Sequence, residues 1–286
     1  MLMLDGIKVR DFHVGRLTLR AKALSCRPTL ALFQIGDNAE SSVYIRQKKK
    51  FAELVGALVI HRHFPTDVSF DVVARAIRAD NLDEGIHGII LQLPVPPHID
   101  GGALIEVIDP RKDVDGLTME SQALLAEGKP RFVPATAKAV KFILDFYGIS
   151  VAGKKAAVLG RSKLVGLPAS RLIRSMGADV TVCHSQTPNT REVTLASDIV
   201  IVAIGKPGLI GREYFKKGAV IIDVGINSVM GEASAGRRLV GDVDHEAAAA
   251  VASAMTPVPG GVGPVTVLSL FDTLMESAED ICRINP

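Results

Sequence analysis

The amino-acid sequence predicts an α/β fold with largely parallel sheets. Short apolar runs, each long enough for a buried strand, alternate with segments of helical spacing along most of the chain. Glycine or proline ends several of these runs and helical segments, as expected where an element enters a turn. The chain has 286 residues, which corresponds to about two domains at roughly 150 residues each.

The composition is that of an ordinary globular protein. Hydrophobic residues make up 48% of the chain and charged residues 22%, which excludes a disordered or fibrous protein. The net charge is only +2, so we expect no nucleic-acid partner. Asp5 interrupts the N-terminal apolar residues before a signal peptide can form, and no apolar run reaches the ~18 residues of a membrane span. We therefore expect a cytoplasmic protein without membrane partners.

In the first half of the chain, apolar runs and turn residues predict two strands and two helices. The predicted order is a strand over 28–35, a turn over 36–38, a helix over 41–55 ended by Gly56, a helical segment over 71–78, and a strand over 88–93 ended by Pro94.

The second half repeats the alternation more clearly and predicts a doubly wound arrangement of the kind that binds nucleotides. A helix over 136–147, ended by Gly148, bridges the halves. The elements that follow are a strand over 155–159, a helix over 167–175, strands over 179–183, 198–204 and 219–224, and a short helix at 247–250.

The three cysteines, Cys26, Cys183 and Cys282, are far apart and odd in number. This pattern predicts neither a disulfide framework nor a zinc site, and it fits a reducing compartment. We expect no bound metal.

The segment from Gly160 to Pro168 joins a predicted strand to a predicted helix. A glycine there permits a tight turn, and the helix N-terminus offers free N–H groups and a positive dipole end to a phosphate. Ser162 stands where the dinucleotide pattern G-x-G-x-x-G has its second glycine. A purely structural turn glycine therefore remains an alternative interpretation.

The next strand indicates which nucleotide is preferred. NAD-binding proteins usually place an acid at the carboxyl end of this strand to hold the ribose, but Asp179 lies at the other end. The hydroxyls of Ser185 and Thr187, with Arg161 and Lys163 nearby, suit a 2′-phosphate instead. A polar surface loop is the alternative.

Lys48 lies inside the apolar face of the helix predicted over 41–55. The arc comprises Leu54, Phe51, Tyr44, Val55, Lys48, Ala52 and Ile45, and the opposite face carries Arg46, Glu53, Lys49 and Lys50. One interpretation is a lysine stem that runs along apolar surface to reach water. The other is a partly desolvated amine with a lowered pKa, able to transfer protons near neutral pH. Tyr44, one turn earlier, shares its face.

A Tyr-x-x-x-Lys pair also marks short-chain dehydrogenases. In that family the pair follows the nucleotide loop, whereas here it precedes Gly160 by more than a hundred residues. The order of these segments counts against that family.

Two further segments carry candidate site residues. Gln92 ends an apolar strand, at the edge where α/β proteins collect their ligands. Asp113 and Asp115 precede Gly116, and two carboxylates at this spacing fit a metal, an amino-substituted ring or a turn cap. The loop over 256–266 is rich in proline and glycine and fits either the wall of a flat ligand or a helix entry.

Taken together, eight segments resemble the bifunctional methylenetetrahydrofolate dehydrogenase/methenyltetrahydrofolate cyclohydrolase family. They occur in the family's order and span nearly the whole chain. The matching segments are residues 41–48, 88–94, 112–116, 160–168, 183–185, 222–227, 241–243 and 257–266.

The resemblance implies an N-terminal α/β catalytic, folate-binding domain over 1–120 and a C-terminal Rossmann-like NADP-binding domain over 121–263. It implies a cleft between them, a homodimer, and a C-terminal helix over about 264–283 that packs back on the first domain. The implied reactions are NADP-dependent oxidation of 5,10-methylenetetrahydrofolate and hydrolysis of the methenyl product to 10-formyltetrahydrofolate.

The resemblance also assigns roles to single residues. Lys48 is the central catalytic residue, with Tyr44 beside it, Gln92 hydrogen-bonded to it and Asp115 holding the pterin ring. The implied NADP-site residues are Gly160, Arg161, Ser162, Ser185 and Ile226. The closing loop, with Pro259, Gly260, Gly261 and Thr266, borders folate and cofactor.

One departure concerns the start of the bridging helix. Ala135 and Ala137 stand where the family usually has cysteine and proline. The change leaves the ratio of the two activities and the pterin substrate open. The alternatives are a methylene-pterin dehydrogenase without hydrolase activity and a non-catalytic paralogue that binds folate or nucleotide. The retained Tyr44, Lys48, Gln92 and Asp115 argue against the non-catalytic paralogue.

Overall fold

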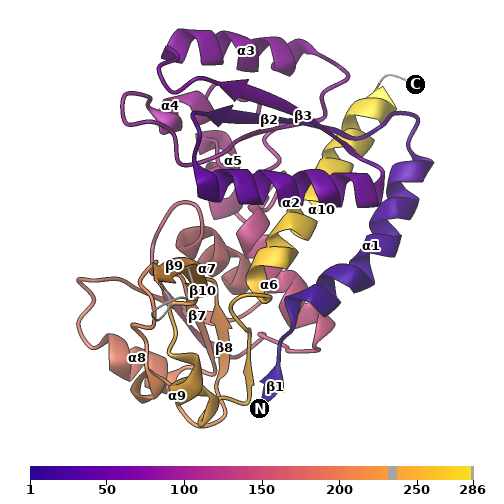
Figure 1. Ribbon diagram of the computed structural model, residues 1–286. Helices are drawn as coiled ribbons and strands as arrows, with labels where there is room; N and C mark the ends of the chain where they lie inside the picture. Colours follow the sequence, from indigo (N-terminus) through magenta and orange to yellow (C-terminus); the bar gives the residue numbers. More distant parts are fainter. Residues whose placement is uncertain (231–236, 285–286) are drawn as a thin grey trace. The chain divides into compact units, whose positions relative to one another are not determined.

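A computed structural model describes residues 1–230 and 237–284 (Figure 1). The chain divides into two compact units. We call Phe12–Ala135 with Val267–Pro286 the small-sheet unit, and Met1–Asp11 with Thr136–Thr266 the large-sheet unit.

The small-sheet unit is built on three parallel strands in the order β3-β2-β4. These are β2 (Thr29–Ile35), β3 (Leu58–Phe64) and β4 (Gly88–Leu91). Helices α2 (Ala39–Val55) and α3 (Phe70–Leu82) lie on opposite faces of this sheet (Figure 1). All seven residues of β2 are buried because helices cover both faces, which explains its uninterrupted apolar sequence.

Helix α2 confirms the predicted helix and begins two residues earlier. Asn38 caps its N-terminus by accepting from the Ser41 N–H, and Gly56 ends it with a left-handed φ of 82°. The predicted apolar face is buried at four positions, which are Ile45, Phe51, Ala52 and Val55.

The helical wheel is wrong at two positions of α2. Leu54 is 55% exposed instead of buried, because it lies at the edge of the arc. Lys49 does not simply face water, since its Nζ lies 3.1 Å from His61 Nδ1 on β3. A wheel cannot show this contact, because it depends on where the neighbouring strand lies.

Two long helices lie before and after the strands of the small sheet along the chain. Helix α1 (Gly6–Ala23) and helix α10 (Val262–Ile284) each begin in the large-sheet unit and continue into the small-sheet unit. Within the small-sheet unit, Asp272 of α10 accepts hydrogen bonds from Arg16 and Arg20 of α1. The Phe271 ring of α10 also contacts the Phe51 ring of α2.

The shorter helices are α4 (Gly101–Ile105), α5 (Met119–Ala126) and α6 (Ala135–Phe146). Helix α6 begins at Ala135 without a proline in its first turn. The loss of the family's proline therefore does not prevent the helix from forming.

The large-sheet unit contains six parallel strands in the order β1-β11-β8-β7-β5-β6. Their bounds are Leu2–Met3 (β1), Lys155–Leu159 (β5), Asp179–Cys183 (β6), Ile199–Val202 (β7), Val220–Asp223 (β8) and Ala254–Met255 (β11). Strand β5 has β6 on one side and β7 on the other. The chain thus reverses its direction of winding next to β5, which is the topological switch point of such sheets.

The remaining elements of this unit connect the strands. They are α7 (Gly166–Ser175), α8 (Thr190–Ala196), a 3-10 turn (Arg212–Tyr214), the hairpin of β9 (Asn227–Met230) and β10 (Arg237–Val240), and α9 (His245–Ala249). The chain's first strand, β1, pairs with β11, so Met1–Asp11 lies in this unit rather than with the residues over 12–120.

The prediction for the cysteines was wrong. Cys26 and Cys282 form a disulfide in the small-sheet unit, and only Cys183 is free among the described residues. The two bonded residues are 256 positions apart, and they meet because α10 returns to the strand that follows Cys26. Cysteine spacing along the sequence does not contain this information.

None of the helices within the described residues combines the length and the apolar character needed to cross a membrane.

Candidate active site and dinucleotide site

The amine of Lys48 meets the amide of Gln92 at the carboxyl end of the small sheet. Lys48 Nζ donates to Gln92 Oε1 over 3.0 Å. Gln92 Nε2 donates to the Leu93 carbonyl over 2.9 Å, which turns the amide so that its oxygen faces the lysine. Because that oxygen can only accept, Lys48 donates to it in both its charged and its neutral state.

Asp115 lies at the same edge of the sheet because the segment that carries it pairs with β4. Asp113 forms a parallel bridge with Ile89 of β4, so the chain after Asp113 runs beside the end of that strand. Asp115 is close enough to Lys48 that each charge shifts the pKa of the other.

Asp113 itself is a turn cap, which is one of the alternatives left open for this pair of carboxylates. It is 1% exposed and accepts from the N–H groups of Leu117 and Thr118 and from the Ser121 hydroxyl. Gly116 has a φ of 68°, and a Cβ there would lie 3.1 Å from Pro134. These contacts fix the turn that carries Asp115.

Burial dominates the ionisation of this site. Burial lowers the pKa of Lys48, and the Asp115 carboxylate partly opposes that shift. Burial raises the pKa of Asp115, with Lys48 opposing and Asp113 reinforcing the change. A lysine with a lowered pKa presents a neutral amine at lower pH than a lysine in water, as a proton acceptor requires.

Tyr44 lies one helical turn before Lys48 on α2 and is partly buried. Ser41 at the start of the same helix donates to the Leu93 carbonyl over 3.4 Å. Helix α2 is therefore tied to the segment after β4 at Ser41 as well as at Lys48.

In the large-sheet unit, Gly160 ends the strand at the switch point. Its φ is 114°, and a Cβ would lie 2.1 Å from the Ala203 carbonyl oxygen, so only glycine fits. Ser162 Oγ accepts from the N–H groups of Val165 and Gly166 at the start of α7. Arg161 is exposed beside this helix start.

Ser185 follows the neighbouring strand. Leu159 and Cys183 are paired at the ends of β5 and β6, so the segments after these strands emerge side by side. Ser185 and Arg161 are both exposed there. Thr187 instead uses its hydroxyl to accept from the His184 N–H within the turn.

Two buried carboxylates shape the neighbouring loops, and sequence reasoning assigned no role to either. Asp242 is fully buried and accepts from the N–H groups of Ile204, Gly205 and Lys206 after β7. It also accepts from Asn227 Nδ2, beside Ile226. The only signal in the sequence was the acid of the segment Gly241-Asp242-Val243. Its role could not be predicted, because its hydrogen-bond partners lie in other parts of the chain.

Asp223 performs the same function one strand further along. It accepts from the N–H groups of Gly225, Asp242 and Val243 and contacts His245 Nε2 at 2.9 Å. Ile226, which follows this turn, is 40% exposed.

The closing loop is rigid and tightly packed. Gly260 has a φ of 99°, and its carbonyl accepts from the Gly6 N–H. A Cβ at Gly261 would lie 2.4 Å from the Pro257 carbonyl oxygen. Thr266 donates to the Val262 carbonyl in the first turns of α10, and Pro259 is exposed in the loop.

The residues at the carboxyl end of the large sheet fit a dinucleotide with a 2′-phosphate. A helix N-terminus follows the glycine turn, and an exposed guanidinium and an exposed hydroxyl lie at the two adjacent strand ends. The one acid of β6, Asp179, lies at the opposite end of that strand. When bound, such a cofactor supplies a hydride acceptor.

A parallel sheet with a dinucleotide site, joined to a second α/β unit that carries a half-buried lysine, defines a nicotinamide-dependent enzyme. The chain belongs to the tetrahydrofolate dehydrogenase/cyclohydrolase family. Residues 4–115 match the catalytic domain of that family, and residues 134–282 match its NAD(P)-binding domain.

Individual relatives cover nearly the whole chain. The bifunctional protein FolD of Azoarcus sp. is 42% identical over 284 residues, covering 98% of this chain and 97% of that protein. The FolD structure of Trypanosoma brucei, solved with NADP and an inhibitor, is 36% identical with a TM-score of 0.93 and covers 100% and 99% of the two chains. An NAD-dependent 5,10-methylenetetrahydrofolate dehydrogenase of Saccharomyces cerevisiae, at 20% identity and a TM-score of 0.78, covers 98% and 97% and shares the fold.

The geometry predicts how the pKa of Lys48 responds to its neighbour. Asp115→Asn removes the charge that favours the ammonium form, so the pKa of Lys48 should fall below its value in the native protein. NMR titration of lysines labelled by reductive 13C-methylation measures this pKa directly. Asp71→Asn, on the exposed surface of α3, is the matched control and should leave it unchanged. An unchanged or higher pKa in the Asp115 variant would contradict the electrostatic coupling.

Proposed function

We propose that the protein oxidises 5,10-methylenetetrahydrofolate with NADP and hydrolyses the methenyl product to 10-formyltetrahydrofolate. In the first step a hydride leaves the methylene carbon, and the two flanking nitrogens share the resulting positive charge. This step needs alignment and no base to remove a proton from carbon. In the second step water adds to that carbon and the bond to N5 breaks. One proton of the water moves to N5, and the other is released to solvent as the formyl carbonyl forms.

Lys48 performs the proton transfers of the second step. Its neutral amine accepts the proton of the attacking water, and the ammonium returns that proton to N5 as the ring opens. Its lowered pKa makes the neutral amine available at a lower pH than for a lysine in water. The hydrogen bond from Lys48 Nζ to Gln92 Oε1 is the observation that carries this proposal, because it orients the amine without fixing its charge.

The other predicted residues bind and orient the two ligands. Asp115 accepts hydrogen bonds from the pterin ring, and Tyr44 forms part of the folate site beside Lys48. Gly160, Arg161, Ser162, Ser185 and Ile226 form the NADP site, with Arg161 and Ser185 on the 2′-phosphate. Pro259, Gly260, Gly261 and Thr266 border the ligands.

We also propose that the chain acts as a homodimer in the cytoplasm, without nucleic-acid or membrane partners. The family resemblance supports the dimer. The near-neutral net charge of +2 supports the absence of a nucleic-acid partner.

Lys48→Met tests the catalytic assignment. Methionine keeps most of the stem volume and removes the amine, so methenyl hydrolysis should fall by about 10²–10⁴-fold. The dehydrogenase rate should fall far less, because hydride transfer needs no base. Separate assays of NADPH formation and methenyl hydrolysis distinguish the two effects.

Lys50→Met is the control for this variant, since Lys50 is exposed on the same helix. It should retain both activities. Full hydrolysis by the Lys48 variant, or an equal loss in the Lys50 variant, would assign the proton transfer to another residue.

Arg161→Ala tests the cofactor assignment. Loss of a charged hydrogen bond to the 2′-phosphate should raise the KM for NADP by about 10- to 100-fold and change the KM for NAD little. Lys154→Ala removes an exposed cation at the opposite end of β5 and should affect neither. Equal increases for both cofactors in the Arg161 variant would exclude the 2′-phosphate role.

A further inference from the structure

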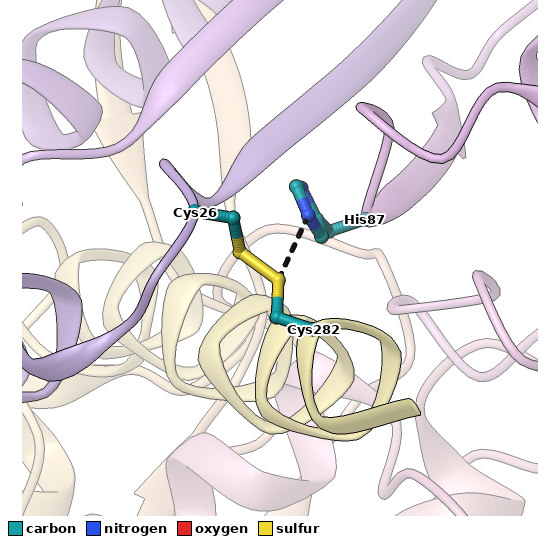
Figure 2. Close-up of side chains that lie close together, drawn as sticks. All are labelled: Cys26, His87 and Cys282. Atoms are coloured by element: carbon teal, nitrogen blue, oxygen red, sulfur yellow. Dashed lines mark hydrogen bonds between the residues drawn. A yellow bond between two sulfur atoms is a disulfide. The ribbon is translucent and has the colours of Figure 1, made fainter. Parts of the chain in front are cut away.

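The disulfide of the small-sheet unit has a buried histidine beside it. Cys26 lies between α1 and β2, Cys282 lies in the last turns of α10, and their Cα atoms are 6.5 Å apart. His87 precedes β4 and is 2% exposed. Figure 2 shows its ring edge directed at the sulfur of Cys282, at the 3.4 Å contact between Nε2 and Sγ. We call these three residues the thiol cluster.

The hydrogen bonds of His87 determine which nitrogen carries the proton. The Thr29 backbone N–H donates to Nδ1 over 3.1 Å, and a backbone N–H can only donate. Nδ1 is therefore the acceptor, and the proton of the neutral ring lies on Nε2. Burial, reinforced by the charge of Lys112 and opposed by that of Asp83, lowers the pKa of His87 and so favours the neutral ring. His87 thus presents one N–H to Cys282 Sγ and none to Cys26.

The position of the proton on Nε2 argues against a metal site at these three residues. The two sulfurs and a His87 nitrogen lie within 4.8 Å of one another, as in a three-ligand zinc site. A metal would bind the lone pair of Nε2, so the proton of the neutral ring would have to lie on Nδ1. There it would face the Thr29 N–H, and two donors cannot form a hydrogen bond with each other. The structure uses Nε2 as a donor and the sulfurs as a disulfide, which favours thiol chemistry over metal binding.

We propose that Cys26 and Cys282 form a reversible, redox-sensitive clamp, in which Cys282 is the leaving sulfur and Cys26 the sulfur attacked by a low-molecular-weight thiol. Both cysteines are partly exposed, so such a thiol can reach them. A hydrogen-bond donor stabilises a thiolate, and the sulfur with the more stable thiolate leaves faster.

Reduction of the Cys26–Cys282 disulfide consumes two molecules of the small thiol. The first thiolate attacks Cys26 Sγ, the disulfide breaks, and Cys282 leaves as a thiolate that His87 stabilises. A second thiolate attacks the added sulfur of the mixed disulfide and releases Cys26 as a thiolate. The two cysteine thiolates take up the protons that the small thiols gave up. The protein gains two electrons and two protons, and the two small thiols become one disulfide. Oxidation of the protein by that small disulfide is the reverse sequence.

The clamp holds the end of α10 against the small sheet. Ser277, just over one turn before Cys282, donates to the carbonyls of His87 and Arg111. The disulfide adds a covalent link across 256 positions of sequence. Reduction removes that link, so the stability of the small-sheet unit depends on the thiol balance of its surroundings. Disulfides that form in reducing compartments are usually of this transient kind.

Mass spectrometry of the native full-length chain tests the exchange. The protein is reacted briefly with glutathione, quenched in acid and digested. The Cys26–Cys282 link should be present beforehand, and the glutathione adduct should lie on Cys26. In Cys282→Ser, treated with glutathione disulfide, the adduct on Cys26 should persist. An absent link, or an adduct mainly on Cys282, would overturn the proposal.

Two further measurements keep the proposal testable if a variant folds poorly. Reduction of the native protein by dithiothreitol should lower Tm by about 5–15 °C, while Tm of Cys282→Ser should not respond to it. His87→Phe should slow reduction by glutathione about three- to tenfold, and His87→Gln, which retains an N–H, should restore part of the rate. If the reduced protein instead holds one zinc per chain by elemental analysis, the cluster is a metal site and the clamp is wrong.

Discussion

The hydrogen bond between Lys48 and Gln92 is the interaction on which the small-sheet unit is organised. It joins one face of α2 to the carboxyl end of β4, and burial of the amine at that junction lowers its pKa. Its geometry depends on β2, whose seven buried residues separate the layer of α2 from that of α3. The Asn38 cap and the Ser41 contact then fix where along α2 the lysine lies. A residue with a specific protonation behaviour thus results from the packing of a parallel sheet.

Buried carboxylates have a second, structural use in both units. Asp113 holds the turn that presents Asp115, Asp242 holds the loop that follows β7, and Asp223 holds the loop that follows β8. Each accepts several backbone N–H groups that would otherwise be unpaired in the interior, and an unpaired buried donor costs about 1–3 kcal/mol. The glycine-containing loops after β7 and β8 are therefore held in one conformation by Asp242 and Asp223.

Much of this could be predicted from the sequence, and the limits have physical causes. Helical periodicity placed Lys48 inside an apolar face, and the end of an apolar strand identified Gln92, because both signals are local. The strand Leu58–Phe64 escaped prediction because His61, Arg62 and His63 interrupt its apolar residues. The register that brings Asp115 to Lys48, the contact of Lys49 with His61, and the Cys26–Cys282 disulfide all depend on elements distant in sequence. Periodicity carries no information about such contacts.

We propose that the protonation of Lys48, which burial and an uncharged partner determine, controls methenyl hydrolysis. The most direct measurement is the pH dependence of that hydrolysis in the native protein and in Gln92→Glu. A carboxylate 3.0 Å from the amine favours the ammonium form and raises the pKa of Lys48. The rise of the rate with pH should therefore move to higher pH in the variant, with the plateau rate reduced far less than in a variant without the amine. A variant whose rate rises at the same pH as in the native protein would show that the protonation of Lys48 does not control the hydrolysis.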